Sequence, residues 1–136
     1  MKILMLDAEY VKFTPTKPGL KEHEKVEGEI QEEDVILIFI HGEPDDFARE
    51  KDVLKKLLKN IKWLAGKLNK RKVILHSFAH LSEAKGDPTL VKKIIQQGRE
   101  RLENVGFTVK VTPFGWFFDL ETKLIGHSLG RIFKDI

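Results

Sequence analysis

The sequence predicts a single α/β domain over residues 1–136, with a mixed, mostly parallel central sheet and two crossover helices. Two short and nearly continuous apolar runs, at residues 35–41 and 73–78, are typical of strands covered on both faces. An amphipathic segment with helical spacing follows each run. Strand–helix–strand order favours parallel pairing through right-handed crossovers, and 136 residues are enough to bury one core.

The N-terminal quarter of the chain begins with a predicted strand at residues 2–13, which is rich in apolar residues. Residues 14–19 contain prolines and a glycine, so they are expected to end this strand. The acidic stretch 21–34 is expected to form a loop or an irregular edge. Residues 35–41 then form the predicted central strand.

The first helix is expected to begin near Asp45 or Asp46, because aspartate is a preferred N-cap residue. Its lysines occupy the other faces, and for them a solvated surface is favoured over an RNA-binding face. The apolar residues that recur at helical spacing are Phe47, Leu54, Leu57, Leu58, Ile61, Leu64, Ala65 and Leu68.

The C-terminal half opens its helix with a clear start signal, an Asp87 cap followed by Pro88. Gly106 is expected to end this helix. Alternating apolar residues over 107–112 predict another strand. A last strand is predicted at residues 116–124, after a Pro-Phe-Gly corner. This short connection favours antiparallel pairing with the strand before it.

Composition excludes several classes of protein. The chain has no cysteine, which excludes disulfides and thiolate metal sites. It has no glycine-rich phosphate loop or dinucleotide fingerprint, and its five histidines show no metal-ligand spacing, so neither a cofactor nor a metal is expected. No apolar run approaches the length of a membrane span, and a cytoplasmic protein is expected. A net charge of +3 permits an RNA partner, and the scarcity of Asn and Gln beside many Lys and Glu suggests a thermophile.

Two histidines and an aromatic run are candidates for a site. His80 follows the end of a buried strand, at the edge where open α/β sheets bind ligands. On residue pattern alone, a histidine satisfied by the backbone of a turn is the favoured alternative. For His127 the alternative is a turn residue whose ring packs on Trp116. The aromatic run 116–118 is suited either to stacking a nucleic-acid base or to packing in the core.

Three short motifs occur together along the chain: Ala79-His80-Leu81-Ser82, Pro113-Phe114-Gly115-Trp116 and Gly126-His127-Ser128-Leu129. In their order and approximate spacing they resemble the N-terminal editing domain of archaeal threonyl-tRNA synthetases. The resemblance extends over nearly the whole chain. It implies a fold like that of D-aminoacyl-tRNA deacylases and a homodimer.

The resemblance also implies a reaction, the hydrolysis of the ester in a mischarged tRNA such as seryl-tRNA for threonine. A ribose hydroxyl of the terminal adenosine is thought to assist in this family, and no cofactor is implied. His80 takes the place of the family's strand-end histidine and becomes the candidate catalytic residue. The partner is the tRNA 3′ end, and the candidate substrate-binding residues are Gly42, Ala79, Pro113, Gly115, Trp116, Phe117, Phe118, His127 and Arg131.

The chain departs from the family pattern at three places. Phe117-Phe118 stands where the family has Tyr-Lys, Arg131 where it has glutamate, and Asp7-Ala8-Glu9 where it has His-Ser-Asp. Phe118 is expected to project into the aminoacyl pocket, with Arg131 nearby. Such changes suggest altered specificity or lost catalysis.

Two functions therefore stay open. One is a stand-alone deacylase that acts in trans, since no synthetase body follows in this chain. The other is a catalytically silent, homodimeric module that binds aminoacyl-tRNA or a synthetase partner.

Overall fold

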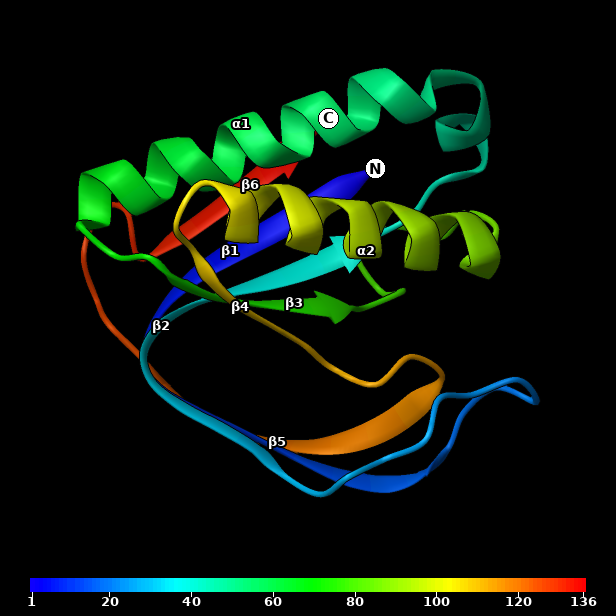
Figure 1. The fold of residues 1–136 in the computed structure, drawn as a ribbon, viewed down its shortest axis with the longest axis horizontal. Helices are drawn as coiled ribbons and strands as arrows, with labels where there is room; N and C mark the ends of the chain where they lie inside the picture. The colour runs from blue at the N-terminus through cyan, green and yellow to red at the C-terminus, as the bar shows by residue number, and fades with distance from the viewer.

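The computed structural model describes residues 1–136, and Figure 1 shows two helices on one face of a curved sheet. The sheet order is β4-β3-β2-β1-β5, and β6 also pairs with β1. Neither helix is both long and apolar enough to cross a membrane. The elements are β1 (Lys2–Pro18), β2 (Ile30–His41), a 3₁₀ turn η1 (Pro44–Arg49), α1 (Glu50–Leu68), β3 (Lys72–Ser77), α2 (Pro88–Asn104), β4 (Thr108–Val111), β5 (Trp116–Leu124) and β6 (Arg131–Asp135).

The two predicted crossovers are confirmed, because β2, β3 and β4 pair in parallel with α1 and α2 between them. The mostly parallel sheet is not confirmed, since β1 pairs antiparallel with β2, β5 and β6. The prediction that the last long strand lies beside the strand before it is wrong. β5 leaves β4 at one end of the sheet and pairs with β1 at the other. All three antiparallel pairings of the sheet therefore involve the long strand β1.

β1 continues through the prolines that were expected to end it. Beyond Phe13, β1 no longer pairs with β2, and its only neighbour is β5. A proline lacks the N–H that a second neighbour would need, so it is tolerated where a strand has one partner. The predicted loop at residues 21–34 is likewise shorter, because β2 already begins at Ile30.

The helix starts show one wrong and one correct prediction. Asp46 is buried at 1% exposure, and its carboxylate accepts hydrogen bonds from the backbone of Glu43 (2.8 Å) and the amino group of Met1 (2.7 Å). It belongs to η1 and does not cap α1. Asp87 does cap α2, where its Oδ1 accepts from the Thr89 amide at 3.0 Å.

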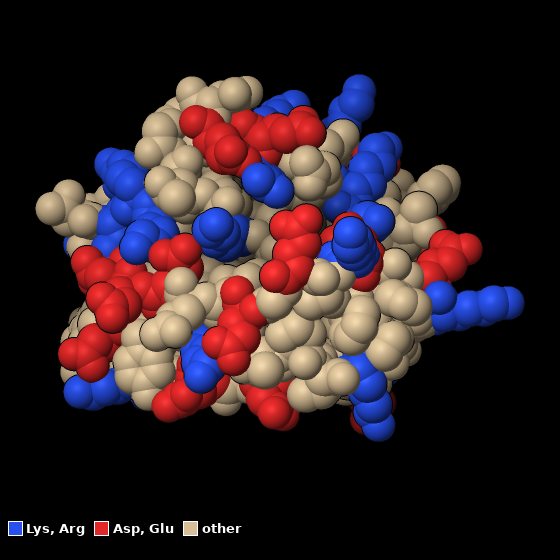
Figure 2. All heavy atoms as spheres, turned by 60° about the horizontal axis from the view of Figure 1, so that its bottom comes forward, with Lys and Arg blue, Asp and Glu red and all other residues tan.

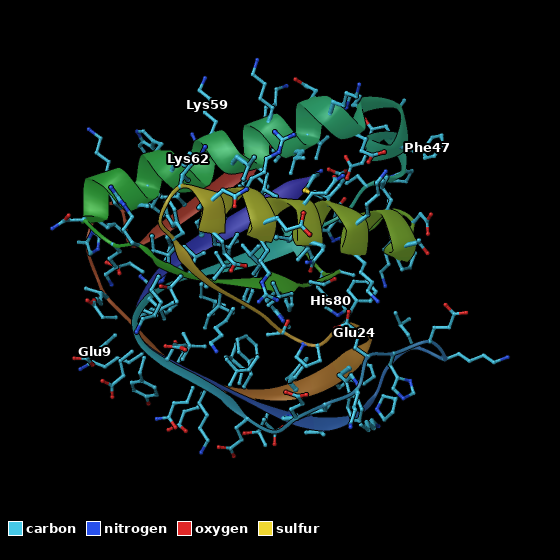
Figure 3. All side chains as sticks on the ribbon, in the orientation of Figure 1. Glu9, Glu24, Phe47, Lys59, Lys62 and His80 are labelled. Carbon is cyan, nitrogen blue, oxygen red and sulfur yellow. The ribbon has the colours of Figure 1, made fainter.

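Two apolar clusters cover the two faces of the sheet. The larger packs both helices onto the sheet, and the smaller lies on the opposite face, built around β1 and β2. Phe47, predicted within the helical stripe, belongs to neither and is 77% exposed (Figure 3). The far ends of β1 and β2 curl with β5 beneath the helix-covered part (Figure 1). A pocket lies beside β5, and its lining also includes Pro88 and Val91 of α2.

The short β6 was not predicted from the sequence. It pairs with Lys2–Leu6 of β1, whereas β5 pairs with residues 8–18, so the two lie end to end along β1. Arg131 stands opposite Leu6 and Phe118 opposite Pro15, about 30 Å apart along the strand. The prediction that Arg131 lies near Phe118 is therefore wrong.

Candidate functional site

A pocket of about 440 Å³ opens where β2 and β3 end, opposite β5. Parallel strands present their carboxyl ends at one edge of the sheet, and α/β proteins place ligand sites there. Most of the predicted site residues come together in its lining, namely Gly42, Ala79, His80, Pro113, Gly115, Trp116, Phe117 and Phe118.

A second hollow, of about 750 Å³, lies over the middle of the β1–β2 ribbon, beside β5. It is larger, but its lining is mostly charged and includes Glu9, Glu33 and Glu121. None of the predicted site residues lines it. We therefore place the candidate site in the smaller pocket, whose walls are apolar and better enclosed.

His127 and Arg131 lie outside the pocket. His127 Nε2 donates to Asp7 Oδ2 at 2.7 Å, and its Nδ1 accepts from the Leu129 amide at 3.2 Å. Both ring nitrogens are thus occupied. Its ring does not pack on Trp116, which meets His23 edge-on at 5.4 Å. Arg131 is exposed on β6.

His80 is the one histidine whose ring nitrogens make no hydrogen bond within the chain, since each of the other four has a partner. Its imidazole is exposed at the pocket, with its ring edge-on to Phe78 at 5.1 Å. The amides of Ala79 and His80 also donate no hydrogen bond within the chain. One edge of the pocket therefore carries an imidazole and two amides, all free to meet a ligand.

The loop that carries His80 is held by buried His41. Nε2 of His41 donates to the Ala84 carbonyl at 2.7 Å, and its Nδ1 accepts from the Leu81 amide at 3.2 Å. Only the neutral imidazole with its proton on Nε2 makes both bonds. A Cβ at Gly42 would lie 2.1 Å from Cγ2 of Val91, so glycine lets α2 pack closely beside this loop.

Sequence reasoning missed His76, which lines the pocket from β3. Its Nδ1 and the Thr112 hydroxyl share a 2.8 Å hydrogen bond. Burial lowers the pKa of His76 to about 4, so its imidazole is neutral at pH 7. The alternation of side chains along a strand could have identified it. His76 lies on the same face of β3 as Ile74 and on the opposite face from Leu75, which faces the helices.

Lys85 was also missed, and no sequence pattern marks it. It is the only Lys, Arg, Asp or Glu in the pocket lining, and it makes no ion pair. The lysines of α1 are remote from it. Lys59 points to solvent from the outer side of α1, away from His80 (Figure 3), and Lys62 is also exposed. On the face that Figure 2 shows, acidic and basic side chains are interspersed.

A cluster of charged side chains, in which Asp7 and Lys70 are largely buried, lies at the opposite end of β2 and β3. Asp7 accepts hydrogen bonds from Lys70 and His127, and Lys70 also contacts Asp34 at 2.9 Å. Burial by itself would raise the pKa of Asp7, but the hydrogen bonds from Lys70 and His127 outweigh it and lower that pKa. No three His, Asp or Glu side chains gather in a way that could hold a metal ion.

Comparison with known proteins gives one family over the whole chain. A family model described as the archaea-specific editing domain of threonyl-tRNA synthetase matches residues 1–136. Threonine–tRNA ligases of Thermococcus onnurineus (strain NA1) and Methanoregula boonei (strain DSM 21154 / JCM 14090 / 6A8) are each 27% identical, over 139 and 136 residues. The matches cover 100% of this chain but 22% of those ligases, so the chain spans about a fifth of their length.

Among solved structures, the c-Myc DNA Unwinding Element Binding Protein superposes with a TM-score of 0.70. The match covers 100% of this chain and 99% of that one, at 11% sequence identity. At this identity the likeness concerns the fold alone.

Proposed function

Because the chain belongs to the family of archaea-specific editing domains of threonyl-tRNA synthetase, we propose that it is a deacylase that hydrolyses the ester of a mischarged tRNA in trans. Membership of this family supports a role in aminoacyl-tRNA editing in general. The tRNA 3′ end, with its aminoacyl-adenosine, is the proposed ligand of the pocket.

The observation that carries this proposal is the pocket edge at Ala79 and His80. Ester hydrolysis needs donors for the oxygen on which negative charge develops, and the two amides without a partner in the chain are proposed to supply them. It also benefits from a group that moves a proton, and the free imidazole of His80 is such a group. Both lie on one loop that His41 holds in place.

In the proposed reaction a water oxygen attacks the ester carbonyl carbon, and the carbonyl oxygen becomes an oxyanion beside the amides of Ala79 and His80. His80 takes the proton from the water. The tetrahedral intermediate then collapses, the bond from carbon to the ribose oxygen breaks, and that oxygen receives the proton. The products are a free amino acid and an uncharged tRNA. Lys85, the unpaired cation of the lining, is proposed to contact a phosphate of the tRNA end.

Replacing His80 by alanine is expected to slow single-turnover deacylation by about 100-fold. Stability should be nearly unchanged, within about 0.5 kcal/mol, because the side chain is exposed and makes no hydrogen bond. The measurement is ester loss from a panel of mischarged tRNAs, together with thermal unfolding. His23→Ala is the matched control, since His23 is exposed but does not line the pocket. Equal rates for the two variants would contradict the role of His80.

A catalytically silent module is the second candidate, and one observation favours it. Phe118 lies in the pocket lining where the family has lysine, and its ring packs on Phe13 at 5.6 Å. A cation that could hold a water or a carbonyl oxygen is thereby replaced by an apolar ring. Binding of aminoacyl-tRNA or of a synthetase without ester loss would favour this function over the deacylase.

We also propose that the chain forms a homodimer through β5. This strand lies at an edge of the sheet, and its Phe117 and Leu120 are 53% and 41% exposed. Light scattering at micromolar concentration should give about twice the 15.7 kDa of one chain, and Leu120→Lys should shift the mass to that of one chain. A stable monomer of the unmodified chain would contradict the proposal.

A further inference from the structure

Part of the pocket is lined by a group of aromatic rings from four segments of the chain. The imidazole of His76 lies at the centre of four phenyl rings, and we call these five side chains the aromatic floor. The distances from the His76 ring centroid are 4.7 Å to Phe13, 5.4 Å to Phe39, 5.9 Å to Phe118 and 6.2 Å to Phe78. Within the floor the rings of Phe39 and Phe78 also stack on each other, with their centroids 4.5 Å apart.

The aromatic floor has little capacity for hydrogen bonds. Its one polar member, His76, is neutral because burial lowers its pKa to about 4. One of the two ring nitrogens of His76 is already bonded to the Thr112 hydroxyl. No carboxylate or cation belongs to the floor, and the single charged side chain of the lining, Lys85, is exposed on the loop above.

We propose, resting on the deacylase function above, that this pocket takes the ester of an apolar amino acid larger than alanine, such as leucine or phenylalanine. A seryl hydroxyl would find no partner on the floor except the remaining nitrogen of His76. Without that bond it would exchange its hydrogen bonds to water for contact with phenyl rings, which is unfavourable. An apolar side chain gains contact with the same rings and loses no hydrogen bond.

Phe118 is the residue that decides this preference. It stands in the lining where the family has lysine, and its ring contributes both to the pocket wall and to the packing of Phe13 and His76. The lysine that it replaces would have brought a donor and a positive charge to the same place. Selectivity in such a pocket is set by the size of the apolar group, with each methylene worth about 10–200-fold.

The test uses amide-linked 3′-aminoacylamino-3′-deoxyadenosines, which cannot be hydrolysed, so that binding is measured whether or not the chain is catalytic. Seryl, alanyl, leucyl and phenylalanyl derivatives, and adenosine alone, are titrated by calorimetry into the unmodified chain. We expect the leucyl and phenylalanyl derivatives to bind at least about tenfold more tightly than the seryl one. Adenosine alone should bind more weakly than either.

Two variants test whether the aromatic floor causes the preference for apolar over seryl derivatives. Phe118→Asn places a polar side chain in the lining and should reduce the leucyl-over-seryl ratio by about tenfold. Phe133→Asn is the matched control, because Phe133 is 51% exposed on the other edge strand beside β1 and does not line the pocket. It should leave the ratio unchanged. Thermal unfolding is measured for both variants to check that they are folded.

Seryl binding as tight as leucyl binding would overturn this inference and leave the deacylase proposal standing. Adenosine binding as tight as that of every derivative would also overturn it, since the floor would then hold the base. Failure of all derivatives to bind would overturn the deacylase proposal and this inference together.

Discussion

Replacing Asp7 by asparagine is expected to lower the free energy of unfolding by about 3 kcal/mol. The side chains of Asp7 and Lys70 are only 5% and 10% exposed, so the substitution leaves a desolvated ammonium without its main counter-charge. The amide has nearly the shape of the carboxylate, so packing is retained and the loss reports on charge. The measurement is denaturant unfolding at pH 7.

Asp34→Asn is the matched control, because Asp34 contacts the same ammonium at 2.9 Å but is 81% exposed. An exposed ion pair contributes little, so its loss is expected to cost less than about 1 kcal/mol. Equal losses from the two substitutions would show that the burial of Asp7 is not what makes its pairing strong.

The contribution of Asp7 to the free energy of unfolding also depends on pH. Its pKa in the folded chain lies below the ordinary value of 3.8. A carboxyl of this kind contributes stability above pH 3.8, and the contribution is lost as the pH falls through its folded pKa. The unmodified chain and Asp7→Asn should therefore become more similar in stability as the solution is acidified below pH 3.8.

The second large effect is expected from His76, through acidification between pH 6.5 and 4. Its pKa falls from 6.5 to about 4 on folding, so the unfolded chain binds more protons in this range. The stability that neutral His76 contributes is complete above pH 6.5 and is lost as the pH falls toward 4. Allowing for the partial exposure of the ring, the loss should be about 2–3 kcal/mol. Unfolding curves at several pH values measure it.

The comparison variant for His76 replaces both members of its hydrogen bond. His76→Phe alone would leave the hydroxyl of Thr112, a residue that is 4% exposed, without its partner. His76→Phe with Thr112→Val removes donor and acceptor together, a change that can be nearly neutral at pH 7. The double variant should be less sensitive to acid than the unmodified chain between pH 6.5 and 4. Parallel stability curves over that range would exclude His76 as the titrating group.

The helices and crossovers could be predicted from the sequence because their signals are local. The Asp87 cap and the stop at Gly106, which has a φ of +94°, are properties of a few adjacent residues. Apolar runs and helical spacing are likewise read within one segment. The strand-end position of His80 followed from the same signals, and residues of two of the three motifs, 79–80 and 113–116, line one pocket.

The antiparallel half of the sheet was decided by tertiary structure. Nothing within residues 116–124 specifies that this strand crosses the sheet to pair with β1 rather than with β4. The prolines of β1 are acceptable only because a single strand flanks them there, which the sequence does not reveal. The separation of Arg131 from Phe118 follows from that same pairing.

The sequence by itself determined the two crossovers, the Asp87 cap of α2 and the stop at Gly106, since each depends on backbone conformation and periodicity over a few residues. Only the tertiary structure placed His76 among the phenyl rings of Phe13, Phe39 and Phe118, and His127 on Asp7. Those contacts join residues far apart in the chain. They depend on which strands pair, and that choice is made by the burial of the whole apolar surface rather than by any one segment.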